Sequence, residues 1–106
     1  MAYTYRFKDI EGNIIYVGFT GQTMAERMNQ HFTKGHLPAE CYKSVASIEY
    51  MRWKTKSDAQ VMEVYFINKY KPRYNKFPLS KHHFRFYIFD ILFLLHFDNI
   101  LWVNAL

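Results

Sequence analysis

Two hydrophobic patterns near the amino terminus predict a pair of β-strands. Residues 3–8 (YTYRFK) alternate aromatic with polar side chains, the period of two expected for a strand with one buried face. The side chains expected to be buried are Tyr3, Tyr5 and Phe7. A second run, rich in β-branched residues, covers residues 14–19, and residues 9–13 (DIEGN) between the runs are typical of a turn. The two runs therefore predict an antiparallel hairpin.

A capping pattern predicts a helix after the hairpin. Residues 23–26 (TMAE) form a capping box, in which the Thr23 hydroxyl accepts from the third helical amide and the Glu26 side chain returns to the cap amide. The helix should begin at Met24, and Gly35 should end it in the left-handed conformation that glycine tolerates. Its apolar stripe would contain Met24, Ala25, Met28 and Phe32, with Arg27 and His31 on the border.

The next segments predict a loop, a third strand and a second helix. Residues 36–43 are expected to form the loop and residues 45–53 the strand. Residues 57–60 (SDAQ) form another capping box, so a helix should run from there to about residue 70, where a Lys-Pro pair stops it. Glu63 falls in the middle of the apolar arc of this helix. Because an unpaired charged carboxylate is costly in a core, Glu63 must be protonated, paired or bound to a cation.

The order of these elements predicts an α/β (α+β) fold, a three-stranded antiparallel sheet flanked by helices. A chain of 106 residues and 12.9 kDa buries one core and cannot hold two substantial domains. Its single cysteine, Cys41, excludes an internal disulfide and a cysteine-built zinc site, as expected in a reducing compartment. The first residues lack the basic and then apolar pattern of a signal peptide, so we expect a cytoplasmic protein.

Charge is distributed unevenly along the chain. The formal net charge is +5, a balance that favours polyanionic partners such as DNA. Residues 1–76 contain twelve basic and seven acidic side chains, whereas residues 77–106 contain two of each. The composition also becomes markedly apolar after residue 76. The sequence therefore predicts a basic domain of residues 1–76 and an apolar C-terminal extension of residues 77–106.

The apolar extension is not expected to cross a membrane. Arg85, Asp90 and Asp98 interrupt it, and its longest uncharged run falls far short of the roughly 20 residues that span a bilayer. Three interpretations stay open: a segment covering the exposed sheet face, a homo-oligomer interface, or a terminus poorly matched to the core. Packing against the core or a second copy is favoured, because such a segment would promote aggregation if exposed.

Five short motifs, in order along the chain, resemble the GIY-YIG nuclease family. The residues that carry the resemblance are 3–5 (YTY), 16–18 (YVG), Arg27 with His31, Glu63, and 71–75 (KPRYN). The last of these is similar to the ending seen in the nuclease subunit of bacterial nucleotide-excision repair. The resemblance covers residues 3–76. It departs at the first two positions, where the family has Gly and Ile and this chain has Tyr3 and Thr4.

The resemblance implies a metal-dependent endonuclease that hydrolyses DNA phosphodiester bonds, and it implies roles for three ring side chains. Tyr5 would take the proton from water, His31 would assist by hydrogen bonding, and Tyr16 would position groups near the phosphate. A phenol with a pKa near 10 is a poor base at neutral pH. Nearby cations would therefore have to lower the pKa of Tyr5.

Three further residues have roles that the resemblance implies. Arg27 would bind phosphate oxygens, for which its planar fork of donors is suited. Glu63 would bind Mg²⁺ or Mn²⁺, and one carboxylate is enough because Mg²⁺ keeps several waters. Asn75 would help to hold the site or the substrate backbone. The structural alternatives are a surface ion pair for Arg27, a neutral hydrogen-bonded core residue for Glu63, and a turn residue for Asn75.

A basic segment follows the second predicted helix. Lys69, Lys71, Arg73 and Lys76 are interleaved with Tyr70 and Tyr74. This arrangement suits DNA phosphates with some stacking on the bases, although a solubilising surface run has the same composition. A rival hypothesis for the chain as a whole is a catalytically inactive basic DNA-binding or protein-interaction module on the same scaffold, which residues 3–4 and the apolar extension would permit.

Overall fold

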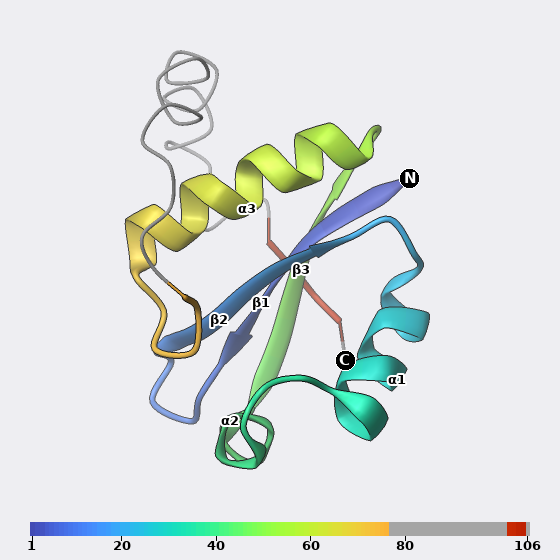
Figure 1. Ribbon diagram of the computed structural model, residues 1–106. Helices are drawn as coiled ribbons and strands as arrows, with labels where there is room; N and C mark the ends of the chain where they lie inside the picture. Colours follow the sequence, from blue (N-terminus) through green and yellow to red (C-terminus); the bar gives the residue numbers. More distant parts are fainter. Residues whose placement is uncertain (77–101, 106) are drawn as a thin grey trace.

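The chain folds into one antiparallel sheet with helices on both of its faces (Figure 1). The computed structural model describes residues 1–76 and 102–105. In chain order the elements are β1 (Ala2–Lys8), β2 (Ile14–Thr20), α1 (Met24–Lys34), α2 (Ala39–Ser44), β3 (Ser47–Trp53), α3 (Lys56–Tyr70) and β4 (Val103–Asn104). No helix in these ranges is long and apolar enough to cross a membrane.

The sheet confirms the α+β fold and the three predicted strands, and it adds a fourth. Its strand order is β2-β1-β3-β4, and β1 is antiparallel to both β2 and β3. The expectation of a sheet with three strands was wrong because Val103 pairs with Tyr50 and Asn104 with Glu49. The backbone of β3 would otherwise present an unpaired edge, and a short strand from the end of the chain covers part of it.

The first strand is buried on both faces, whereas its alternating pattern predicted one buried face. Helix α3 packs against one face of the sheet, and α1 and α2 lie on the other (Figure 1). Tyr5 and Phe7 are buried as expected, but Thr4 and Arg6 are buried too. The Thr4 hydroxyl donates to the Ala59 carbonyl of α3 at 2.7 Å. Thr4 thus anchors the central strand on α3, and β1 keeps regular pairing with both neighbours.

The last described residues pack against the core around Arg6. The Arg6 side chain donates to Glu49 at 2.8 Å, and its guanidinium carbon lies 4.2 Å from the ring centroid of Trp102. Trp102 is buried and its ring centroid is 4.9 Å from that of Phe66 on α3. For residues 102–105 this is the predicted packing of the extension against the core. The alternative prediction, self-association through the extension of residues 77–106, falls mostly on residues 77–101, which lie outside the described part of the chain.

Helix α1 begins where predicted but ends for a different reason. Thr23 accepts from the Glu26 amide at 3.2 Å, and its hydroxyl donates to the Glu26 carboxylate, which replaces the expected return to the cap amide. Gly35 has φ −65° and is extended, so the predicted left-handed cap was wrong. A side chain at Gly35 would instead collide with the Tyr42 hydroxyl and the His31 carbonyl. The glycine is required by close packing.

Two other boundaries differ from the prediction. The segment of residues 36–43, expected as a loop, contains α2, which follows Pro38 and is anchored by the buried Cys41. Pro38 is the N-cap residue and has an extended backbone, with φ −57° and ψ 147°, so the helix begins immediately after it. Helix α3 begins at Lys56 with Thr55 as its cap, which accepts from the Asp58 amide at 3.1 Å. The capping pattern was therefore displaced by two residues from the predicted Ser57.

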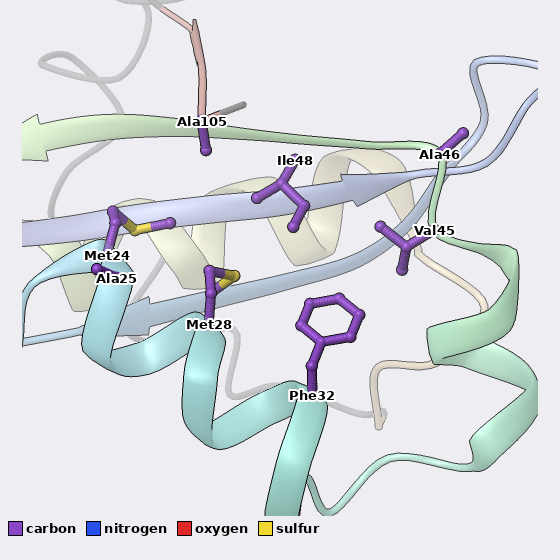
Figure 2. Close-up of a pocket in the computed structure, with 8 residues that line it drawn as sticks. All are labelled: Met24, Ala25, Met28, Phe32, Val45, Ala46, Ile48 and Ala105. Carbon is purple, nitrogen blue, oxygen red and sulfur yellow. The ribbon is translucent and has the colours of Figure 1, made fainter.

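The apolar stripe of α1 faces the sheet across an open groove. Figure 2 shows Met24, Met28 and Phe32 pointing toward Ile48 and Ala105. The groove has a volume of about 430 Å³. Phe32 remains 46% exposed, and the buried residue of α1 is not on the predicted stripe but on its border, where His31 is 1% exposed. The periodic pattern thus indicated the correct face, but not how closely it approaches the sheet.

Candidate active site

The Tyr5 hydroxyl lies where polar side chains of β1 and α1 meet. Tyr5 is completely buried, and its hydroxyl oxygen lies 2.6 Å from His31 Nε2. Arg27 donates from Nε to the same oxygen at 3.2 Å. Arg27 and His31 are four residues apart, so both project from the same side of α1. The structure therefore brings together three of the predicted site residues from two separate elements.

Gly18 makes room for the Tyr5 hydroxyl. The two residues pair directly between β1 and β2. A β-carbon at Gly18 would lie 2.5 Å from the Tyr5 hydroxyl and 3.0 Å from the Tyr16 ring. Real β-carbons do not approach other atoms this closely, so any larger residue would displace the ring of Tyr5 from the site.

Replacing Gly18 with alanine is expected to lower the free energy of unfolding by about 1–3 kcal/mol, because the added methyl group overpacks a buried region. Urea denaturation followed by circular dichroism measures this change. Gly21→Ala is the matched control, since its β-carbon would approach Lys56 no closer than 3.5 Å. A Gly18→Ala protein as stable as the native protein would contradict the placement of the Tyr5 ring.

His31 is a neutral hydrogen-bonding group at the site. Burial lowers the pKa of His31 to about 4, and electrostatic interactions with Arg27 and His36 act in the same direction. Its Nδ1 atom lies 2.8 Å from the Tyr42 hydroxyl, so both ring nitrogens have partners. Tyr16 is buried beside it, with ring centroids 5.7 Å apart. A neutral imidazole can accept or donate in this position, which suits the predicted assistance by hydrogen bonding.

The pKa of Tyr5 is raised, in contrast to the lowering that its predicted role requires. Burial raises this pKa to about 12, and the negative charge of Glu63 adds to the rise. The charge and hydrogen bond of Arg27, together with a hydrogen bond from Tyr16, act in the opposite direction but do not outweigh burial. Burial also raises the pKa of Tyr16. Arg27 alone therefore does not make Tyr5 acidic, and the expected lowering of its pKa by Arg27 together with a metal on Glu63 stays a prediction.

Glu63 is a half-buried carboxylate beside the two tyrosines. Burial raises its pKa to about 7, and its charge acts on both Tyr5 and Tyr16. Glu63 makes no hydrogen bond or ion pair with any described residue, which argues against the alternative of a neutral, hydrogen-bonded core glutamate. A carboxylate left unpaired near a polar site is costly unless a cation binds it.

The donor set at Glu63 fits a hard divalent cation. Within the described ranges no group of three or more His, Cys, Asp or Glu side chains comes together, so these residues hold no pre-formed protein cage for zinc. Mg²⁺ does not need such a cage, because it keeps several waters and takes further oxygens from substrate phosphates. A single unpartnered carboxylate beside the predicted catalytic groups is compatible with that mode of binding.

Asn75 holds the outer edge of β2 at the site. Its side-chain amide donates to the Val17 carbonyl at 2.8 Å and accepts from the Val17 amide at 2.8 Å. Val17 lies between Tyr16 and Gly18 on β2, the outermost described strand on its side of the sheet, so its outward backbone groups pair with no other described strand. The Asn75 side chain makes the two hydrogen bonds that a neighbouring strand would make to the backbone of Val17. It therefore supports the site through the backbone, in keeping with the first of its two predicted roles.

Arg27 lines a hollow that is also lined by the side chain of a second basic residue, Lys56. The hollow has a volume of about 470 Å³ and is lined by Phe19, Thr20, Gly21, Gln22, Arg27 and Lys56. Two cations and no carboxylate line it, and Arg27 bonds to Tyr5 and Gln30 instead of the predicted alternative of an acidic surface partner. Sequence analysis missed Lys56. The signal depends on the correct cap. With Thr55 as the cap, Lys56 lies in the first turn of α3, where the helix dipole disfavours a positive charge.

The four predicted DNA-binding side chains, Lys69, Lys71, Arg73 and Lys76, are all exposed. Lys69 lies 5.3 Å from the ring centroid of Tyr70, and the Arg73 guanidinium carbon lies 5.2 Å from that of Tyr74. Lys71 adopts a left-handed conformation, with φ 47°, and caps α3. These cations are accessible to phosphates, and two of them lie over tyrosine rings of the chain itself; the predicted stacking on DNA bases stays a prediction.

Sequence analysis also missed Tyr42, which contacts His31. No motif or period marked it, because it falls in the segment that was predicted as a loop. Its partner is eleven residues away along the chain. Only the packing of α2 against α1 brings the two side chains together.

Comparisons with known proteins bear on the family of the chain. A family model described as the GIY-YIG catalytic domain matches residues 1–75. Similar sequences include UvrABC system protein C from Bacteroides thetaiotaomicron, 38% identical over 74 residues, and from Caldanaerobacter subterraneus, 40% identical over 75 residues. Each alignment covers 67% of this chain and 12% of the relative. The chain thus spans about an eighth of the length of these relatives, and its resemblance to the family is confirmed.

Proposed function

The chain belongs to the GIY-YIG family, and from this premise we propose that it is a metal-dependent endonuclease that hydrolyses DNA phosphodiester bonds. The observation that carries the proposal is the convergence of Tyr5, Arg27 and Glu63, which come from β1, α1 and α3. Arg27 donates to the Tyr5 hydroxyl at 3.2 Å, and the charge of Glu63 acts on the same phenol. A phenol, a fixed cation and an unpaired acid at one place are the groups that phosphodiester hydrolysis needs.

Each group has a distinct role in the proposed reaction. Tyr5 takes the proton of the attacking water, and Arg27 binds the phosphate oxygens as negative charge develops on them. Glu63 holds Mg²⁺ or Mn²⁺, which when bound supplies positive charge at the phosphate and the leaving oxygen. Lys56 and Arg27 line the hollow that would receive a backbone phosphate. Tyr16 positions groups near the phosphate, and Asn75 holds β2 in place.

The proposed substrate is the DNA backbone, contacted through charge. The exposed Lys69, Lys71, Arg73 and Lys76 would neutralise further phosphates, which predicts binding that weakens steeply with salt. One active site per chain would leave single-strand nicks unless two copies cooperate. Because the chain spans only an eighth of the matched relatives, their activity as whole proteins is not transferred to it.

A nicking assay on supercoiled plasmid tests the proposed function. The native protein should convert supercoiled DNA to the open-circular form when Mg²⁺ or Mn²⁺ is present, and EDTA should abolish the conversion. Binding without cleavage under every metal condition would instead support the rival hypothesis of an inactive binding module. That rival draws on one specific observation, the raised pKa of Tyr5, since a phenol with a pKa of about 12 stays protonated at neutral pH and supplies almost no phenolate to act as a base.

A further inference from the structure

We propose that Tyr42 is a positioning residue that fixes the tautomer of His31, so that Nδ1 carries the hydrogen and Nε2 accepts from the Tyr5 hydroxyl. The catalytic consequence of this inference rests on the proposed function, whereas the tautomer itself does not. The structural basis is a continuous polar chain in which the Tyr42 hydroxyl, the His31 ring and the Tyr5 hydroxyl are joined at 2.8 Å and 2.6 Å.

The hydrogen-bonding capacity of Tyr5 determines one end of the chain. A neutral phenol oxygen accepts two hydrogen bonds and donates one. Tyr5 is completely buried, and its oxygen has as described hydrogen-bond partners Arg27 Nε, which can only donate, and His31 Nε2. Its own hydrogen therefore needs an acceptor, and His31 Nε2 at 2.6 Å is the closest described atom that can provide one. Nε2 accepts only if it carries no hydrogen.

The hydrogen-bonding capacity of Tyr42 determines the other end. A neutral imidazole with a free Nε2 must carry its hydrogen on Nδ1. The Tyr42 oxygen lies 2.8 Å from Nδ1 and can accept that hydrogen, while it also accepts from the Leu37 amide at 3.4 Å. Tyr42 is only partly buried, so its own hydrogen can be donated to water. The hydroxyl groups of Tyr5 and Tyr42 and both ring nitrogens of His31 then all have hydrogen-bond partners in one arrangement.

Gly35 gives independent support for this role of Tyr42. Gly35 has an ordinary extended backbone, so no conformational need explains a glycine there. A β-carbon at this position would collide with the Tyr42 hydroxyl and with the His31 carbonyl. The glycine thus keeps open the space through which the Tyr42 hydroxyl reaches the His31 ring.

The arrangement gives His31 a defined part in proton transfer. When Tyr5 takes the proton of the attacking water, the hydrogen that Tyr5 held moves to His31 Nε2. The imidazole becomes an imidazolium, and the water becomes the hydroxide that attacks phosphorus, so protons and charge balance. Because burial disfavours the imidazolium, it would form only while the negative hydroxide and phosphate lie nearby. Tyr42 then accepts from an imidazolium, which strengthens its hydrogen bond. Tyr42 thus orients His31, which acts as the base toward Tyr5, in the way that the third member of a catalytic triad orients its histidine.

Nitrogen-15 NMR of the ring of His31 tests the tautomer directly. At pH 7 the native protein should show the Nδ1–H form, with Nε2 unprotonated. Tyr42→Phe keeps the ring that packs on Phe7 and Phe32 but lacks the hydroxyl, and should give a mixture of the two tautomers. Gly35→Ala should do the same by displacing that hydroxyl. Tyr50→Phe is the matched control, because the Tyr50 hydroxyl bonds to no described residue.

The nicking rate gives the second measurement. Tyr42→Phe should reduce the rate about tenfold, less than the loss seen when a charged orienting group is removed from a catalytic histidine. A native spectrum with the hydrogen on Nε2, or a Tyr42→Phe spectrum identical to the native one, would overturn the inference. If the native tautomer is as predicted and the protein nicks no DNA, the proposed function fails while the positioning role stands.

Discussion

Replacing Arg27 with alanine is expected to reduce the plasmid-nicking rate about 10³-fold, the effect of removing an arginine that stabilises transition-state charge in phosphoryl transfer. Arg27 is the one cation bonded to Tyr5 among the described residues, and it lines the hollow beside that phenol. Its removal also takes away the hydrogen bond and charge that oppose the rise in the pKa of Tyr5. The variant would therefore lose charge stabilisation at the phosphate, and Tyr5 would ionise even less readily.

Two further variants separate these contributions. Arg27→Lys keeps the charge but loses the planar fork, so its rate should fall between those of Arg27→Ala and the native protein. Arg52→Ala removes an exposed arginine of β3 and should nick at close to the native rate, which controls for net charge. The proposed function could not stand if Arg27→Ala nicked within threefold of the native protein.

Replacing Glu63 with glutamine should also reduce the plasmid-nicking rate about 10³-fold, and added Mg²⁺ or Mn²⁺ should not restore the rate. The amide is close in shape to the carboxylate but lacks the negative charge that a hard divalent cation requires. In the native protein the ionised form of Glu63 must be available for metal, and its pKa is about 7. The apparent metal affinity should therefore fall as the pH is lowered below 7 and become constant above it.

The same substitution should make the metal-free protein more stable above pH 7. The pKa of Glu63 is raised by burial from 4.5 to about 7. Between these values the folded protein holds a proton that the unfolded chain releases, so stability is lost as the pH rises through this range. Glutamine does not titrate and avoids that loss. After allowance for partial exposure, the gain in the free energy of unfolding should be about 1–2 kcal/mol at pH 8.

A substitution that lowers activity but raises stability identifies an acid that serves function, whereas loss of an acid that stabilises the fold would lower stability. Urea denaturation at pH 5 and pH 8 measures the stability, and the nicking assay measures the activity. Glu11→Gln, at an exposed carboxylate in the turn between β1 and β2, should change neither. A Glu63→Gln protein that is less stable at pH 8 than the native protein would mean that the carboxylate stabilises the fold, contrary to the account given above.

Much of the fold was predictable because its signals are local. The hairpin, the start of α1 at Met24 and the end of α3 at Tyr70 follow from periods, caps and a proline that act within a few residues. The errors arose where distant parts of the chain compete. Residues 102–105 pair with β3 and cover Arg6, and α3 buries a face of β1 that the alternating pattern assigned to solvent.

The candidate site divides in the same way. The types and order of Tyr5, Tyr16, Arg27, His31 and Glu63 were enough to predict the family, and to propose a chemistry from it, because the functional groups of side chains can be read from the sequence. The tertiary structure alone decided which atoms meet, how far burial moves each pKa, and that Tyr42 and Lys56 join the site. Hydrogen bonds and desolvation change over fractions of an ångström, and residues far apart in the sequence reach that proximity only when the chain has folded.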